Sequence, residues 1–132
     1  MIILKNIHEK IIEIALKRCP DPKKIEDFLY PEKTNLMAPF DLPGVEEAVL
    51  RIKKGIENKE RILIYGDYDA DGITSTALLY RALCKIHNQV NYYIPERDGE
   101  GYGLNKEALT QISLEGTNLI ITVDCGIKSY SL

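Results

Sequence analysis

The chain has 132 residues, of which 45% are apolar and 28% charged, and its formal net charge is −3. This length suits one compact domain, and the composition is ordinary for a globular protein. The acidic balance excludes a basic module that grips nucleic acid through clustered Lys and Arg. No apolar run approaches the roughly 18 residues that span a bilayer. The N-terminus turns polar at Lys5, too early for a signal peptide, so we expect a cytoplasmic protein without a membrane partner.

Residues 1–60 are predicted to be a helical lead-in. Apolar residues at near-helical spacing predict a first helix over residues 6–19, which Pro20 ends. Asp21 and Pro22 predict the N-terminus of a short helix that reaches about Tyr30. Asp41 is expected to cap a longer helix that starts near Pro43 and carries an apolar stripe to residue 56.

Residues 61–132 alternate between strand and helix patterns. Strands are predicted at 61–65, 90–94 and 118–123, and helices at 73–87 and 105–114, the second capped by Asn105. This β-α-β-α-β order indicates a parallel sheet, so the fold class is α/β, with N-terminal helices followed by the sheet. Ligands bind such sheets at the carboxyl ends of the strands.

Four aspartates fall at those strand ends. Asp67, Asp69 and Asp71 occupy alternate positions after the first strand, and Asp124 follows the third. Packed carboxylates repel one another, and no Lys or Arg lies within residues 66–72 to offset them. A cation is the economical explanation, and oxygen-only ligands favour Mg²⁺ or Mn²⁺. The alternative is that these aspartates only cap the next helix and solvate a turn.

The start of the next helix is a candidate phosphate site. If that helix begins at Ile73, its free N–H groups face the aspartates, and Thr74 and Ser75 lie in its first turn. We therefore predict that Thr74 and Ser75 contact the substrate.

Two other interpretations of the acidic turn are weaker. A calcium loop of the EF-hand kind needs a bidentate Glu where this chain has Leu78, and a strand precedes the turn instead of a helix. A phosphotransferase with a nucleophilic aspartate would place a hydroxyl directly after Gly72, where Ile73 intervenes.

Three segments resemble a known family. Residues 64–75 resemble motif I of the RecJ-type single-strand DNA exonucleases, which belong to the DHH phosphoesterase superfamily. Residues 93–97 and 100–104 resemble the loop that follows the second strand in that family, and residues 122–126 resemble its motif II. The resemblance covers essentially the whole chain and implies that residues 61–132 are the first part of a DHH domain.

The resemblance also assigns roles. It implies that Asp69 and Asp71 bind metal, that Asp124 bridges two Mn²⁺ or Mg²⁺ ions, and that Asp67 is a catalytic residue beside the metals. Tyr65 stands where the related family II pyrophosphatases carry a metal-binding histidine, a departure that fits a nuclease better.

The implied substrate is single-stranded DNA. The family hydrolyses phosphodiester bonds from 5′ to 3′ in DNA repair and recombination, and two ions about 3.5–4 Å apart would align the attacking and leaving oxygens. Arg97, Gly101 and Tyr102 are candidates to hold the DNA, with Arg97 on a terminal phosphate. An exposed loop arginine without a role is an equally open interpretation of Arg97.

Other functions stay open. A DHH phosphodiesterase could act on short oligonucleotides or cyclic dinucleotides, although the 100–104 loop argues against it. A non-catalytic remnant could bind only metal or a partner. The three cysteines are widely spaced, which disfavours a zinc site or a disulfide framework, and nothing supplies Cys125 with a base.

The third family motif, Asp-His-His, is absent. Neither His8 nor His87 stands in such a sequence, so we expect a truncated piece, an incomplete gene product or one part of a split protein. An uncovered apolar sheet surface in such a piece would favour self-association.

We predict that the isolated chain does not digest DNA, because much of the expected metal shell is missing. A single-turnover assay with Mn²⁺ and 5′-phosphorylated single strands measures this, and robust digestion would refute it.

Overall fold

The chain folds into two compact units, residues 1–45 and 46–132. The computed structural model describes residues 7–19, 21, 24–30, 37–99, 101 and 103–129. None of the helices in this part of the chain is long and apolar enough to cross a membrane.

The first unit contains two short helices, and their ends differ from the predictions. Helix α1 spans Glu9–Arg18, and His8 caps it by accepting the backbone N–H of Lys10 at Nδ1, 3.3 Å away. Helix α2 spans only Ile25–Leu29. The prediction that Asp21 caps α2 was wrong, because Lys24 is the N-cap and makes no side-chain capping bond. Pro20 and Pro22 lie outside the described residues.

The segment before the long helix also differs. Pro39–Asp41 forms a 3₁₀ helix, η3, and the long helix α3 spans Val45–Glu57. The prediction that Asp41 caps this helix was wrong, since three residues separate the end of η3 from the start of α3.

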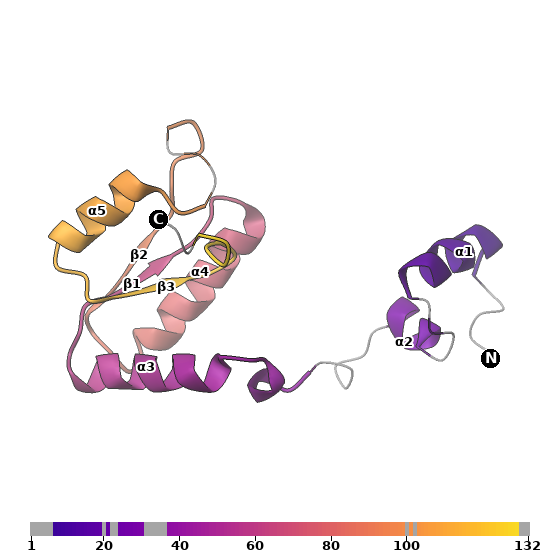
Figure 1. Ribbon diagram of the computed structural model, residues 1–132, viewed down its shortest axis with the longest axis horizontal. Coiled ribbons are helices and arrows are strands. Elements are labelled where there is room, and N and C mark those ends of the chain that lie inside the picture. The colour runs from indigo at the N-terminus through magenta and orange to yellow at the C-terminus, as the bar shows by residue number, and fades with distance from the viewer. Residues whose placement is uncertain are drawn as a thin grey trace. The chain divides into compact units, whose positions relative to one another are not determined.

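The second unit is built on a three-stranded parallel sheet (Figure 1). Its strands are β1 (Ile62–Tyr65), β2 (Val90–Tyr93) and β3 (Leu119–Thr122), in the order β2-β1-β3. Helix α4 (Ala70–Leu83) connects β1 to β2, and α5 (Lys106–Leu114) connects β2 to β3. The predicted β-α-β-α-β order is confirmed, and so is Asn105 as the N-cap of α5, where it accepts the Ala108 N–H at 2.9 Å.

Alternate residues of β1 pack against helices on opposite faces of the sheet. Ile62 and Ile64 join one apolar cluster with residues of α3 and α4, and Leu63 and Tyr65 join another with residues of α5. All four β1 residues are therefore buried, as a continuous apolar run at the centre of a parallel sheet predicts. This rigid central strand holds the turn that follows it.

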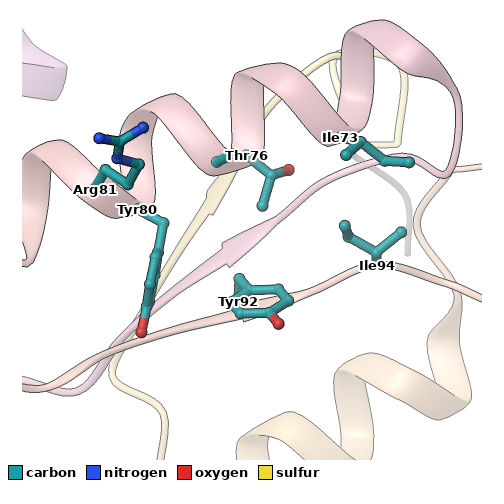
Figure 2. Close-up of a pocket in the computed structure, with 7 residues that line it drawn as sticks. Ile73, Thr76, Tyr80, Arg81, Tyr92 and Ile94 are labelled. Carbon is teal, nitrogen blue, oxygen red and sulfur yellow. The ribbon is translucent and has the colours of Figure 1, made fainter.

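A cavity of about 380 Å³ lies between α4 and the outer strand β2. Figure 2 shows Tyr80 of α4 and Tyr92 of β2 against each other there, with their ring centroids 5.3 Å apart in an edge-on arrangement. Among the residues that the structure describes, Arg81 is the only charged one that lines the cavity, and none of them brings a carboxylate to it. The acidic chemistry of the chain therefore lies elsewhere.

Helix α4 approaches the end of β1 very closely. A Cβ atom added to Gly66 would overlap Thr76 Oγ1, and one added to Gly72 would overlap the backbone carbonyl of Asp67. Only glycine leaves room for this contact, which fixes the turn between β1 and α4.

We predict that Gly66→Ala lowers the free energy of unfolding by about 1–3 kcal/mol, as overpacking does in a buried contact. Chemical denaturation of the purified chain measures the change. Gly99→Ala is the matched control, because an added Cβ meets nothing within 4 Å there. Its effect should stay within about 0.5 kcal/mol. Thr76→Ala in the Gly66→Ala background should recover part of the loss, and simple additivity of the two changes would contradict the contact.

Candidate metal centre

Two neighbouring strands deliver the acidic residues to one edge of the sheet. β1 and β3 pair in parallel with Tyr65 opposite Thr122, and a further bond from the Val123 N–H to the Tyr65 carbonyl (3.0 Å) extends the ladder. The turn after β1 and the turn after β3 therefore start side by side. Carboxylate oxygens of Asp67, Asp69 and Asp124 all lie within 4.8 Å of one another.

Asp69 is held by the backbone of α4. Its Oδ1 accepts the N–H groups of Asp71 (3.0 Å) and Gly72 (2.9 Å), which makes it the N-cap of the helix. The prediction that this helix begins at Ile73 was wrong, because the cap starts it at Ala70 and the Ile73 N–H bonds to the Asp69 carbonyl at 2.9 Å. The Ile73 N–H, which was expected to face a phosphate, is thus used by a backbone carbonyl, and the N–H groups of Asp71 and Gly72 at the true start of the helix bond the Asp69 carboxylate.

Asp67 is the most buried of the group, with no exposed surface. Its Oδ1 accepts the Tyr68 N–H at 2.7 Å, and its Oδ2 is buried with no hydrogen-bond partner among the described residues. An unpartnered buried carboxylate oxygen is costly, and a cation is the simplest group that would satisfy it. The residues present therefore fit a divalent ion held by oxygen ligands.

Asp124 completes the group from the turn after β3. Its backbone is left-handed, with φ of 58°, and the Gly126 that follows has φ of 91°. Desolvation, and then the negative charges of Asp69, Asp71 and Asp67, raise the pKa of Asp124 above its usual range. Because the Asp124 side chain is exposed, screening by water limits the effect. The carboxylates of this group therefore repel one another, and a bound cation would relieve this repulsion.

Asp71 lies just outside the close group. It is exposed in the first turn of α4, and its charge acts on Asp124 from there. The sequence grouped Asp69, Asp71 and Asp124 as ligands, whereas the structure gathers Asp67, Asp69 and Asp124. The alternate spacing of Asp67, Asp69 and Asp71 indicated all three as candidate site residues. The spacing could not show which of their side chains lie close to Asp124.

The hydroxyl groups of Thr74 and Ser75 bond within their own helix. Thr74 Oγ1 donates to the Ala70 carbonyl at 2.7 Å, and Ser75 Oγ donates to the Asp71 carbonyl at 2.6 Å. Either hydroxyl would have to leave such a bond before it could donate to a phosphate.

The loop after β2 carries the remaining candidates. The guanidinium of Arg97 lies over the Tyr68 ring, 5.4 Å from its centroid. Gly101 is exposed with φ of 78°, and Tyr102 lies outside the described residues. Tyr65, which sequence reasoning treated only as a missing histidine, donates from its buried hydroxyl to the Gly103 carbonyl at 3.2 Å. The need of a buried tyrosine for a polar partner could have suggested such a role.

Neither histidine belongs to the described acidic group. His8 caps α1, and His87 Nε2 donates to the Glu60 carbonyl at 2.7 Å, so both have structural partners. Cys125 follows Asp124, and its Sγ lies 3.8 Å from the Tyr65 carbonyl. Burial and the charges of Asp67 and Asp124 raise the pKa of this thiol, which keeps it protonated and a poor nucleophile.

Comparison with known proteins agrees with this geometry. Residues 61–132, more than half of the chain, match the DHH family, N-terminal domain. The chain belongs to the DHH family. The match begins one residue before β1 and includes all three strands and the whole acidic group.

Individual relatives show which proteins of the DHH family this chain resembles. The chain is 49% identical over 102 residues to the single-stranded-DNA-specific exonuclease RecJ of Bacillus subtilis (strain 168), an alignment that covers 77% of this chain and 13% of that protein. It is 40% identical over 95 residues to the RecJ of Thermus thermophilus, with 72% and 14% covered. The chain therefore spans only about one seventh of the length of these relatives.

A solved structure supports the same assignment of fold. The crystal structure of RecJ in complex with Mn²⁺ from Thermus thermophilus superposes with a TM-score of 0.60 and 34% identity, over 74% of this chain and 13% of that one. That relative binds Mn²⁺, and the acidic group of this DHH chain has a donor set of oxygen ligands that suits such an ion.

The raised pKa of Asp124 leads to a prediction about stability. A carboxyl group whose pKa is higher in the folded than in the unfolded state destabilises the fold when ionised. This penalty is complete above the folded pKa and disappears as the pH falls below the unfolded pKa. Asp124→Asn should therefore raise the melting temperature of the metal-free chain near pH 7, and its advantage over the unaltered chain should shrink as the pH falls through that range.

Thermal melts of both proteins in chelator across a pH series measure this difference. A constant difference at all pH values, or a less stable variant at neutral pH, would show that repulsion at Asp124 is unimportant.

Proposed function

We propose that residues 61–132 form the first part of the catalytic domain of a two-metal exonuclease. The enzyme would hydrolyse phosphodiester bonds of single-stranded DNA from 5′ to 3′ during repair and recombination in the cytoplasm. The observation that carries this proposal is the unpartnered, buried Oδ2 of Asp67, which lies in a group with Asp69 and Asp124. The similarity to RecJ proteins supports the substrate, since those relatives are named for their specificity for single-stranded DNA.

Asp67, Asp69 and Asp124 would hold a first divalent ion, either Mn²⁺ or Mg²⁺. Asp71 is the residue of this chain best placed to serve a second ion, because it is exposed at the rim of the group and its charge already acts on Asp124. When bound, such ions supply charge stabilisation to the scissile phosphate and activate water near neutral pH. Asp67 is thereby proposed as a ligand, a closer role than the sequence alone suggested for it.

The residues of this chain would act mainly by orientation. Two backbone N–H groups fix the Asp69 carboxylate, so that little rotamer freedom remains to be lost when it binds a cation. The Tyr68 N–H fixes Asp67 in the same way. Arg97, Gly101 and Tyr102 would contact the DNA, and Thr74 and Ser75 would do so only if their hydroxyls gave up bonds within α4. Additional oxygen or nitrogen ligands would complete the coordination of these ions.

Two alternative functions are also compatible with the acidic group. A DHH phosphodiesterase that acts on short oligonucleotides or cyclic dinucleotides would use the same carboxylates. A remnant that binds only metal or a partner would keep the carboxylates without turnover, and the proposed tendency of the chain to self-associate would fit it equally well. The experiment below separates these functions by metal binding first and by substrate second.

We predict that Mn²⁺ stabilises the chain through the acidic group. A ligand at 100 times its dissociation constant that binds only the folded state adds about 2.7 kcal/mol to the free energy of unfolding. Asp67→Asn should abolish this gain, whereas Asp98→Asn, which alters an exposed loop carboxylate outside the group, should keep it. Thermal and denaturant unfolding with Mn²⁺ or with chelator measure the effect, and equal losses in both variants would contradict the site.

The substrate is then tested by exchange into a relative. Residues 61–129 of this chain would replace the matching segment of the Bacillus subtilis RecJ, and the chimera would be assayed on single-stranded DNA and on dinucleotides. Digestion of long single strands that requires Asp67 but not Asp98 supports the exonuclease. Cleavage of dinucleotides alone favours the phosphodiesterase, and a folded, metal-binding but inactive chimera favours the remnant.

A further inference from the structure

A cation–π contact joins the turn after β1, which carries Asp67 and Asp69, to the loop after β2. Tyr68 lies between Asp67 and Asp69 in the turn after β1, and Arg97 lies in the loop after β2. The Arg97 Cζ atom is 5.4 Å from the centre of the Tyr68 ring, within the distance at which a guanidinium is attracted to an aromatic face. The two residues are 29 positions apart in the sequence, so the fold brings this pair together.

The tyrosine is anchored on the acidic side of this contact. Its backbone N–H donates to Asp67 Oδ1 at 2.7 Å, and its side chain is half-buried. Tyr68 bonds Asp67 through its backbone and contacts Arg97 through its ring. The position of the guanidinium is therefore linked through Tyr68 to the turn that carries Asp67. A long side chain on a loop would otherwise sample many rotamers.

The guanidinium keeps its hydrogen-bonding capacity. Within the described part of the chain Arg97 forms no ion pair, although it is exposed and covers the ring of a residue that stands between two aspartates in the sequence. A ring face holds the cation without using its five N–H donors, which point outward in the plane of the guanidinium. A carboxylate in place of the ring would also hold Arg97 but would occupy those donors.

We propose that Tyr68 is a positioning residue, whose ring holds Arg97 at the rim of the acidic group so that its free donors can bind a phosphate of the substrate. This inference rests on the proposed function, and it adds the residue that orients the phosphate-binding arginine. A purely structural contact, in which Arg97 only covers the Tyr68 ring, is the competing explanation.

The first measurement tests the position of Arg97 in the metal-free chain. Protons above a ring face are shifted upfield, so the Arg97 side-chain signals should be upfield in the NMR spectrum of the unaltered chain. Tyr68→Phe keeps the ring and should keep the shift, and Tyr68→Leu should remove it. Arg97 signals at the positions of a free arginine in the unaltered chain would overturn the proposal, whatever the stability of the Leu variant.

The second measurement tests whether the position of Arg97 contributes to phosphate binding. The probes are a 5′-phosphorylated dithymidine nucleotide and the same dinucleotide without the phosphate, titrated in the presence of Mn²⁺. Tyr68→Leu should weaken binding of the phosphorylated probe by about 2- to 5-fold, the range that an exposed cation–π contact supplies. Tyr68→Phe should bind it as the unaltered chain does. Arg97→Gln should lose about tenfold or more, and Arg81→Gln, which removes a cation near the other end of α4, should lose nothing.

Equal affinities in the Phe and Leu variants, or no preference of the unaltered chain for the phosphorylated probe, would overturn the proposal. Its failure can be told from failure of the proposed function, because Mn²⁺ affinity is measured in the same samples and should not change in either Tyr68 variant. Loss of Mn²⁺ binding in the unaltered chain would count against the metal site, whereas the upfield shift of Arg97 does not depend on metal.

Discussion

The parallel pairing of β1 with β3 is the constraint on which the rest of the structure depends. It sets Tyr65 opposite Thr122, so the turns that follow the two strands must start from the same edge of the sheet. Both turns carry aspartates, and their oxygens come within 4.8 Å. The sheet is held by apolar packing on both faces, which is strong enough to keep like charges together that would otherwise separate. The free energy of apolar packing in the sheet therefore offsets the electrostatic repulsion among the aspartates at its edge.

The N-terminus of α4 shows how one side chain serves two purposes. Asp69 caps the helix, which is the ordinary structural role for an aspartate before a helix, and it also belongs to the acidic group. Capping and metal binding do not exclude each other, because Oδ1 takes both N–H groups and leaves Oδ2 outside those bonds. The interpretation of these aspartates as caps and their interpretation as ligands were posed as alternatives from the sequence. For Asp69 the two roles are compatible, while among the described residues Asp67 has the unpartnered oxygen that a cap does not need.

Features for which the sequence offers a single candidate could be predicted, and features for which several residues compete could not. The apolar run of β1 and the cap of α5 by Asn105 were found correctly, because each has one candidate in the sequence. The start of α4 was misplaced by three residues, since Asp67, Asp69 and Asp71 are all good caps and only the local backbone decides among them. Asp21 and Asp41 were chosen as caps for their residue type, whereas α1 is capped by His8, a less favoured type. The same ambiguity explains why the sequence did not show that Asp67 lies in the close group with Asp69 and Asp124.

A tyrosine in place of a histidine at position 65 removes a possible metal ligand, but it adds contacts that stabilise the structure around the acidic group. Its hydroxyl bonds the Gly103 carbonyl, and its own carbonyl accepts the Val123 N–H and lies near the Cys125 thiol. One fully buried residue thus ties the loop after β2 and the turn after β3 to the end of the central strand. A histidine at this position would offer a ligand atom but would lack the reach of the phenol to that loop. Compared with a histidine, Tyr65 lacks a ligand nitrogen and instead fixes the loop that also carries Arg97. A loop fixed in this way loses less conformational entropy when it binds a ligand.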